Sequence, residues 1–319
     1  MGHKNRKSLN EQIHDRLQAM EGFGRSKHRD KLDGIQGSYI YSFPTMKAYL
    51  KHCRYFAAFV RELPEAAARL GHKPRTLDEC RQFVPAFLQY QTERGLSPYT
   101  LKLEASALHK LYGETLALEL PRNSRAAIKR SRGEAVRDRN FSLQNNAELV
   151  NFCRCCGPRR SELEKLSANS LRVVDGRYYI SYEKGTKGGK PRLSPITGTP
   201  EEVRRAVVFC RTLTGKNHVH SSLDIHSLRA EYASRVYREH ARPPEGLRGK
   251  WMDYTAATGK YGKYGNRIWK PALYVCRKDR AGVVYDREAL LAASRALGHN
   301  REDVVAGHYL YQQEPERGK

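Results

Sequence analysis

Acidic residues are scarce in this chain relative to basic ones. Asp and Glu number 34 against 58 Lys and Arg in 319 residues, giving a formal net charge of +24 at pH 7. Apolar runs such as YFAAFV at 55–60 are far too short to cross a bilayer, and the start MGHKNRKSLN has neither the apolar core of a signal peptide nor a myristoylation signal. No membrane is therefore expected, and the charge favours a polyanionic partner, most commonly nucleic acid.

The cysteines offer neither a disulfide framework nor a metal site. There are seven of them, an odd number, which fits a reducing, cytoplasmic compartment. The cluster CRCC at 153–156 lacks the spacing of a zinc knuckle, and no second Cys or His pair follows at a suitable distance. We expect these cysteines to lie on a partly buried helix, and we expect no metal and no cofactor.

The length predicts two domains, because 319 residues exceed what one core comfortably holds. Residues 1–38 are polar and mixed in charge, so we expect a basic, loosely ordered N-terminal segment with one short helix at 14–23, HDRLQAMEGF. Residues 39–120 have helical apolar spacing and predict a small helical bundle, with Pro85 expected to kink its second helix. The expected N-caps of the three helices are Ser42, Thr76 and Ser97.

A basic linker is predicted over residues 121–140, PRNSRAAIKRSRGEAVRDRN. Few apolar residues interrupt its charges, so it suits contact with a phosphate backbone; a solvated tether is the alternative. The residues expected to contact DNA are Arg122, Arg125, Lys129, Arg130 and Arg132.

The second domain is predicted over 141–319 and mixes helices with a small sheet. A helix capped by Ser142 is followed by GPRRSELEKL, a second helix, and then by strands on either side of the turn Asp175-Gly176. The turn KGGK leads to a third strand near Leu193, and helices follow at about 200–213 and 225–240. The predicted fold class is mainly α with a small antiparallel sheet, α+β.

An unusual segment at 241–285 interleaves aromatic residues with Gly, Lys and Arg. ALYVCR and GVVYD within it are expected to pair as a hairpin, and Lys260 and Lys263 are candidates for nucleic-acid contact. The alternative is an ordinary insertion whose tyrosines pack onto the domain. The last predicted helices are REALLAASRALG and REDVVAGHYLYQQ.

Four features in this domain follow one another in a fixed order. GPRRSEL contains Arg159 and Glu162, which share a face of the predicted helix. Lys187 stands on the turn of the predicted sheet, and HSLR contains His226 and Arg229. LGHNREDVVAGHYLY ends the series with His299 and, ten residues later, Tyr309. Each feature alone is weak, but together they indicate a site for a phosphodiester.

This series resembles the tyrosine recombinase (phage integrase) family. GPRRSEL is similar to the family's first arginine box, TKGGKPRLSPI to its lysine hairpin, HSLR to its H-x-L-R box, and LGHNREDVVAGHY to its histidine and nucleophilic tyrosine. The helical part GLSPYTLKLEASALHKLYG is similar to its core-binding domain. The resemblance covers about residues 40–313 and is closest to integrases of phages, integrative conjugative elements and transposons.

The resemblance implies a metal-independent DNA strand transferase. Arg159 and Arg229 would bind the non-bridging phosphate oxygens, and Tyr309 would attack phosphorus to leave a 3′-phosphotyrosyl link. Lys187 would protonate the leaving 5′-oxygen, while His226 would assist proton transfer and His299 would donate to the phosphate. Glu162 would orient the basic groups.

The implied assembly is a bacterial, nucleoid-associated one. A C-shaped clamp of two domains would close on double-stranded DNA, and a homotetramer would hold two recombination sites and exchange strands through a Holliday junction. An accessory DNA-bending or directionality factor is an expected partner. Integration or excision of a mobile element is the expected role.

Several alternatives stay open. Tyr311 competes with Tyr309 as nucleophile. Residues two apart on a helix point to different faces, so only one of the two can reach the phosphate, and we favour Tyr309. The segment 241–285 lengthens the gap between Arg229 and His299 beyond the family's usual one. The alternative functions are those of a chromosome-dimer resolvase, a type IB topoisomerase-like enzyme, or a catalytically silent DNA-binding protein on the same fold. An RNA-binding protein would explain the charge but not the ordered boxes.

Overall fold

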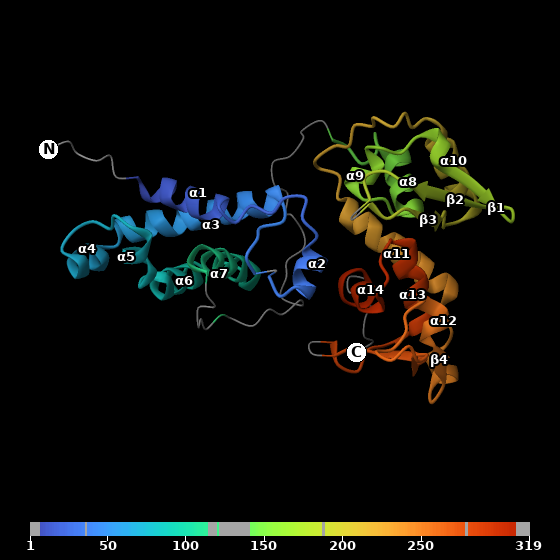
Figure 1. The fold of residues 1–319 in the computed structure, drawn as a ribbon. Coiled ribbons are helices and arrows are strands. Elements are labelled where there is room, and N and C mark those ends of the chain that lie inside the picture. Colours follow the sequence, from blue (N-terminus) through green and yellow to red (C-terminus); the bar gives the residue numbers. More distant parts are fainter. Residues whose placement is uncertain are drawn as a thin grey trace, which may run out of the picture. The chain divides into compact units, whose positions relative to one another are not determined.

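The computed structural model describes residues 7–35, 37–113, 120, 141–186, 189–277 and 280–310. The chain divides near residue 130 into two compact units, which are described separately below. The described part is mainly helical with small antiparallel sheets, which confirms the predicted α+β class (Figure 1). The basic residues Arg122, Arg125, Lys129, Arg130 and Arg132 lie outside the described residues.

The first unit is helical. The caps expected from the sequence are present, because the side chains of Ser42, Thr76 and Ser97 each accept from a backbone N–H three residues later. Its helices are α1 (Leu9–Gln18), α2 (Lys27–Leu32), α3 (Phe43–Glu62), α4 (Pro64–Leu70), α5 (Leu77–Arg81), α6 (Val84–Glu93) and α7 (Pro98–Tyr112).

Two features of this unit differ from the expectation. Pro85 does not kink one helix but stands in the first turn of α6, so α5 and α6 are separate helices; proline lacks the N–H that a continuous helix would need. Helix α1 overlaps the short helix expected at 14–23, but it begins earlier, at Leu9. Its apolar face, Leu9, Ile13 and Leu17, is buried in the same core as α3, so part of residues 1–38 belongs to the first unit.

The second unit begins its core with α8 (Ala147–Cys156). The helix starts at Ala147 rather than after Ser142, because residues 143–146 form turns. Its other helices are α9 (Arg160–Leu163), α10 (Pro200–Arg211), α11 (Ile225–His240), α12 (Tyr254–Thr258), α13 (Arg287–Ala296) and α14 (Glu302–His308), with short 3₁₀ turns η1 (Ala168–Ser170) and η3 (Pro244–Leu247).

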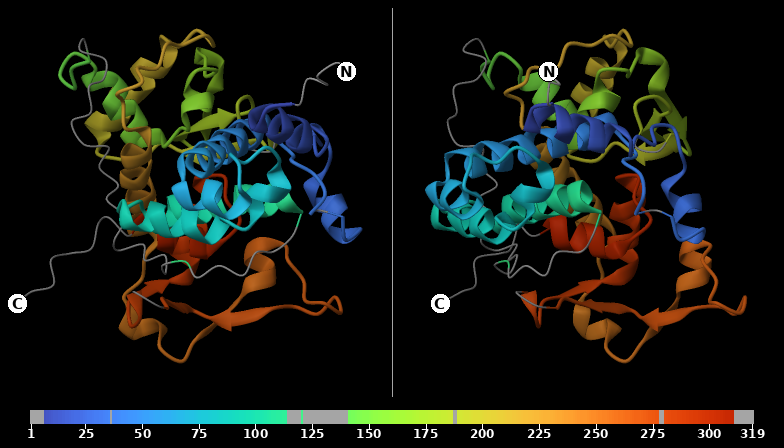
Figure 2. Two further views of the ribbon diagram at one scale, coloured as in Figure 1. Left: turned by 90° about the vertical axis from the view of Figure 1, so that its left-hand side faces the viewer. Right: turned by 60° about the vertical axis from the view of Figure 1, so that its left-hand side comes forward.

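Three small antiparallel sheets complete the second unit. The predicted three-stranded sheet is present as β1 (Leu171–Val174), β2 (Arg177–Tyr182) and β3 (Arg192–Pro195), with the turn at Asp175-Gly176. The predicted hairpin is present as β6 (Leu273–Val275) and β7 (Val284–Asp286). The sequence did not predict the pairing of β4 (Trp251–Asp253) with β5 (Trp269–Pro271). This last pair lies at the opposite end of the unit from α8 and α10 (Figures 1 and 2).

Helix α11 is the centre of the second unit, packed between α8 and α13. The cysteines on α8 lie in this core as predicted, and burial raises the pKa of Cys153 to about 12 and of Cys155 to about 11. Within the described ranges, no three His, Cys, Asp or Glu side chains are grouped so that they could hold a metal ion. No helix in the described part is long and apolar enough to span a bilayer.

Candidate active site

Tyr309 follows the last residue of α14, and its hydroxyl meets two other predicted site residues. The Tyr309 hydroxyl oxygen lies 3.3 Å from Nε of Arg229 and 3.3 Å from Nε2 of His299. The ring of His226 is 5.4 Å away, centroid to centroid. Residues spread over more than 80 positions of sequence therefore meet around one phenol, whose residue is only 7% exposed.

Helix α11 supplies His226 and Arg229 from its first turns. The helix begins after Asp224, whose side chain accepts from the backbone N–H of Ser227 at 3.1 Å. His226 is exposed, whereas Arg229, three residues on, is 3% exposed. Helical spacing thus places an accessible imidazole beside a buried guanidinium on the same side of the helix.

Backbone carbonyls fix the orientation of Arg229. Its Nη1 donates to the carbonyl of Gly157 and its Nη2 to the carbonyl of Leu297, while Nε faces Tyr309. Burial lowers the pKa of the Arg229 guanidinium below its ordinary value. The group still carries charge at neutral pH, because an arginine does not lose its proton in proteins. The buried, positively charged guanidinium of Arg229 is thus fixed beside the Tyr309 hydroxyl.

Gly157 allows the end of α8 to lie close against α11. It ends α8 in the left-handed region, with φ of 59°, and a Cβ atom built on it would lie 2.1 Å from the ring of Tyr232 on α11. Only glycine fits both requirements. The glycine of the GPRRSEL motif therefore has a packing reason in this chain.

Arg159 supplies the second guanidinium group of the site, and the Glu162 carboxylate binds it. Nη1 of Arg159 donates to Glu162 Oε1 at 2.6 Å, and Nη2 donates to the Leu297 carbonyl at 3.1 Å. The backbone N–H of Arg159 also donates to Glu162 Oε2 at 2.6 Å. Because Arg159 and Arg229 share the carbonyl of Leu297, the two guanidinium groups are brought close together.

Arg192 on β3 completes this cluster and was not predicted from the sequence. Its guanidinium binds both carboxylate oxygens of Glu162, with Nη2 to Oε2 at 2.8 Å, and lies over the ring of Tyr182 at 3.8 Å from the centroid. Its Nε donates to the Ala296 carbonyl at 3.1 Å. No local pattern marks Arg192, because it acts through residues 30 and 104 positions away.

The Glu162 carboxylate predicts a measurable dependence of stability on pH. Burial alone would raise its pKa, but the hydrogen bonds and charge of Arg192, with the Arg159 N–H, lower the pKa to about 2 from an ordinary 4.5. The ionised form therefore contributes about 3 kcal/mol, fully present above pH 4.5 and lost as the pH falls towards 2. Glu162→Gln is expected to lose about 3–5 kcal/mol at pH 7 and to flatten this acid limb in urea unfolding.

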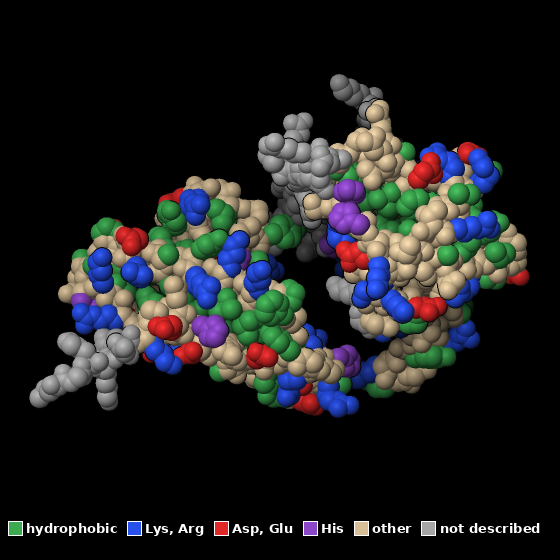
Figure 3. Space-filling model, turned by 90° about the horizontal axis from the view of Figure 1, so that it is seen from above, with side chains coloured by type: hydrophobic (Ala, Val, Ile, Leu, Met, Phe, Trp, Pro, Cys, Tyr) green, Lys and Arg blue, Asp and Glu red, His purple; other side chains and the backbone are tan. Residues whose placement is uncertain are grey.

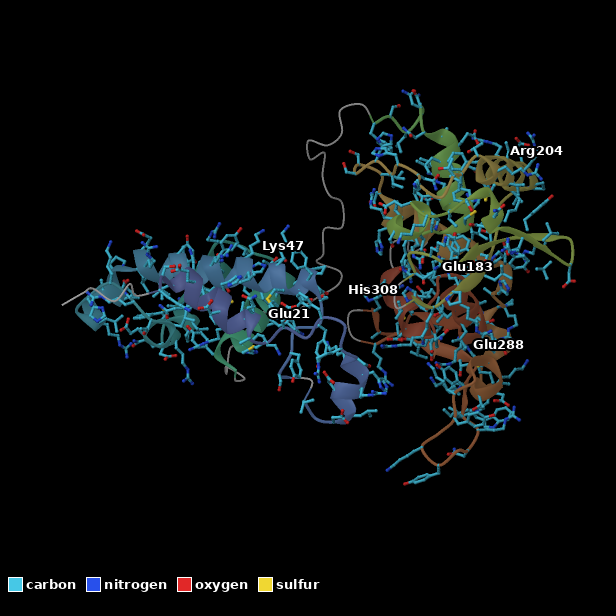
Figure 4. All side chains as sticks on the ribbon, turned by 45° about the horizontal axis from the view of Figure 1, so that its top comes forward. Glu21, Lys47, Glu183, Arg204, Glu288 and His308 are labelled. Atoms are coloured by element: carbon cyan, nitrogen blue, oxygen red, sulfur yellow. The ribbon has the colours of Figure 1, made fainter. Side chains whose placement is uncertain are left out.

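A matched control for that experiment is Glu183→Gln. Glu183 is exposed after β2 and faces Arg172 at 3.6 Å (Figure 4). An exposed pair of this kind contributes at most about 1 kcal/mol. If Glu162→Gln and Glu183→Gln gave the same pH profile as the unaltered protein, the role assigned to the Glu162 cluster would be wrong.

Lys187 lies outside the described residues, but the chain just before it is fixed against α9. The Ser161 hydroxyl donates to the Gly185 carbonyl at 2.8 Å. Gly185 has φ of 74°, and a Cβ atom built on it would lie 2.1 Å from the carbonyl oxygen of Ser161. The bend after β2 that precedes Lys187 is therefore attached to the helix that follows Arg159.

Gly185→Ala is expected to disturb this attachment strongly. The variant should lose at least about 3 kcal/mol of unfolding free energy, because both its φ and the contact with Ser161 are incompatible with a side chain. Gly176→Ala is the control, since Gly176 has a similar φ of 73° but open space around its missing Cβ, and should lose only about 1–2 kcal/mol. Equal losses in urea unfolding would contradict the proposed packing.

Helix α14 is held at its N-terminal end by a buried carboxylate. Glu302 Oε1 accepts from Lys270 Nζ at 3.0 Å and from Arg287 Nη1 at 2.8 Å, and Oε2 accepts from the Tyr254 hydroxyl at 2.8 Å. A negative charge in the first turn also suits the helix dipole. Burial would raise the pKa of Glu302, but its own backbone N–H and these partners lower it to about 2.

The other end of α14 is held by Arg280. Its Nη1 donates to the Ala306 carbonyl at 2.6 Å, three residues before Tyr309, and Nη2 lies 2.5 Å from the Tyr285 hydroxyl. Tyr254, Lys270, Arg280 and Tyr285 all belong to the segment predicted as an insertion at 241–285. This segment therefore positions the tyrosine helix, and Tyr254 and Tyr285 pack onto the domain as the alternative interpretation of the segment expected.

The described contacts of Lys260 and Lys263 are made away from Tyr309. Lys260 Nζ donates to the carbonyl of Asn300, next to His299, and Lys263 is exposed beside Tyr264. Arg160 donates to the carbonyls of Val219 and His220 and so stabilises the loop before α11. Tyr311 lies outside the described residues. On the faces shown in Figure 3, Lys and Arg side chains are spread among Asp and Glu.

Two complexes of one recombinase are among the solved structures to which this chain is similar. The XerH site-specific recombinase bound to difH substrate, a pre-cleavage complex, is 14% identical, with 94% of this chain and 91% of that chain covered and a TM-score of 0.43. The same recombinase on a palindromic difH substrate, a post-cleavage complex, is 13% identical, with 96% and 92% covered and a TM-score of 0.42. No protein-family model and no curated protein matches the chain.

Proposed function

We propose that the chain is a tyrosine-type site-specific DNA recombinase. The observation that carries the proposal is the position of the Tyr309 hydroxyl, 3.3 Å from both Arg229 and His299, with Arg159 held beside Arg229. A phenol is a poor nucleophile towards an anion unless positive groups neutralise the phosphate and favour the phenolate. Two guanidinium groups and two imidazoles around one phenol suit that chemistry.

The reaction proposed is a metal-independent displacement at phosphorus. The Tyr309 oxygen attacks the scissile phosphate, a bond forms between that oxygen and phosphorus, and the bond from phosphorus to the 5′-oxygen breaks. Arg159 and Arg229 stabilise the charge on the non-bridging oxygens, and His299 donates a further hydrogen bond. The phenolic proton leaves with the help of His226, and Lys187 supplies the proton that the 5′-oxygen takes.

Rejoining reverses these steps with a different strand. The 3′-phosphotyrosine keeps the energy of the phosphodiester, so a 5′-hydroxyl from a second duplex restores the backbone without ATP. We propose that a homotetramer holds two sites on double-stranded DNA and exchanges strands in two rounds through a Holliday junction. The biological role proposed is integration or excision of a mobile element, with an accessory DNA-bending or directionality factor.

The test is covalent trapping on nicked duplexes that carry the ends of the element containing the gene, in EDTA and stopped with SDS. The proposal expects a 5′-labelled strand to become attached to protein and the downstream fragment to leave with a 5′-hydroxyl that a polynucleotide kinase phosphorylates. Attachment of the 3′-labelled fragment instead would contradict the proposed polarity. DNA binding without any adduct would favour a silent DNA-binding protein.

A second assay separates the alternatives within the class. A recombinase exchanges markers between two circles that each carry a site. A type IB topoisomerase-like enzyme relaxes a supercoiled circle without exchange, and a chromosome-dimer resolvase acts on two chromosomal sites instead of element ends. Relaxation alone would therefore overturn the proposed strand exchange but keep the tyrosine chemistry.

A further inference from the structure

The only two tryptophans in the sequence lie exposed on one small sheet. Trp251 is 62% and Trp269 56% exposed. In the register of β4 and β5, Trp251 is opposite Pro271 and Asp253 is opposite Trp269. Residues that are opposite each other on paired strands project from the same face of a sheet, and so do residues two apart along one strand. Trp251 therefore shares a face with Asp253, and Asp253 shares it with Trp269, so both indoles project from the same face.

The other face of this sheet packs into the protein and holds the end of α14. Met252 is buried, and its cross-strand partner Lys270 points to Tyr254 and Glu302, where it holds the end of α14. The outward face contributes nothing to that packing. Two large indoles left in water are costly to solubility and are typical of a surface that binds a partner.

The charge around the tryptophans indicates the kind of partner. Residues 248–277 contain seven Lys and Arg and a single acidic residue, Asp253. Arg267 donates to Asp253, so the one carboxylate on the outward face is neutralised. The partner that fits is therefore an anion with apolar or aromatic surface of its own.

A cavity continues this face beyond β4. Its volume is about 580 Å³, and its lining includes Arg248, Lys250, Trp251, Val275 and Arg277. The described residues that line it include no Asp or Glu. Phosphates bound to these cations would lie beside the indole of Trp251, where a sugar or base edge would cover it.

We propose that this surface, the tryptophan face (Arg248, Lys250, Trp251, Trp269 and Arg277), binds double-stranded DNA next to the cleaved phosphate. The inference rests on the proposed function for the position of the duplex. Lys260 links the adjoining loop to Asn300, beside His299, so the surface and the catalytic loop are joined within one unit. The face would add phosphate contacts and sugar packing without taking part in the chemistry.

Intrinsic fluorescence tests the proposal directly, because every tryptophan of the full chain lies on this face. A duplex that gives a gel shift is expected to quench or shift the indole emission in step with binding. If emission stays constant while the duplex is fully bound, the proposal is wrong. A change in emission on concentrating the protein without DNA would instead make the face a contact between copies and would also overturn it.

The cations give a second, independent readout. The triple change Arg248→Gln, Lys250→Gln, Arg277→Gln is expected to weaken duplex binding at least tenfold and to lower the slope of log affinity against log salt by about 2–3. The control triple, Arg204→Gln, Arg211→Gln, Lys216→Gln, removes the same charge from exposed positions on and after α10 (Arg204 is labelled in Figure 4). Equal losses in the two triples would contradict a specific surface.

Trapping separates this inference from the proposed function. If an adduct forms at saturating DNA while emission and salt slope stay unchanged, the tryptophan face fails and the recombinase stands. If emission and slope change but no adduct ever forms, the face stands and the recombinase fails. Trp251→Ala with Trp269→Ala should leave the thermal unfolding temperature unchanged, because both side chains are exposed, and should weaken binding.

Discussion

Tyr309→Phe is expected to bind DNA as the unaltered protein does and to form no covalent adduct. The substitution removes one oxygen and keeps the ring that packs beside His226 and His299. Losing the nucleophile should lower the cleavage rate by a factor of about 10⁴ or more. Single-turnover trapping on a nicked duplex measures this rate, and a gel shift checks binding.

Tyr311→Phe is the control for that result. Tyr311 is the other tyrosine that the sequence offers as nucleophile, and it should keep the cleavage rate within a few-fold. Loss of the adduct only in Tyr311→Phe would keep the class of enzyme and move the nucleophile. Loss in both variants would show that this end of the chain, and not one hydroxyl, is required.

Arg229→Lys is expected to lower cleavage by about 10²–10³ while the variant stays folded. Lysine keeps the positive charge but has no planar fork, so it cannot donate to Gly157, Leu297 and Tyr309 together. The backbone carbonyls that lose a donor are buried, so unfolding free energy should fall by about 1–3 kcal/mol. Single-turnover trapping and urea unfolding give the two quantities.

Arg235→Lys provides the matched control on the same helix. Arg235 also forms a forked ion pair, with Glu202 at 2.8 and 2.9 Å, but it does not contact Tyr309. The control should lose stability without a comparable loss of cleavage. If both variants lost cleavage to the same degree, the effect would come from α11 as a whole rather than from the Arg229 guanidinium.

Local signals explain the parts of the fold that the sequence predicted. Caps such as Ser42 and Ser97, the Asp175-Gly176 turn and the apolar spacing of the helices act over a few residues, so they can be seen in the chain. The break before Pro85 was predicted as a kink, because a proline either bends a helix or starts a new one and the sequence signal is the same for both. The pairing of β4 with β5 was missed because two three-residue strands give too short an alternation.

The residues of the candidate site also divide into those that could be predicted from the sequence and those that could not. Arg159, His226, Arg229, His299 and Tyr309 were chosen by their order along the chain, and the structure brings them together. Arg192, Arg280 and Glu302 could not be chosen this way. Their importance comes from contacts with residues far away in sequence, on elements that meet only in the folded unit.

The two attachments of α14 would make each copy of the chain complete for the proposed cleavage. Glu302 and Arg280 fasten the helix to the body that also carries Arg229 and His299, so lending Tyr309 to another copy would break both attachments at once. Under the proposed function, each subunit would therefore cleave with its own Tyr309. In the proposed tetramer, the subunits would differ in which of them are active at one time, and they would not exchange α14.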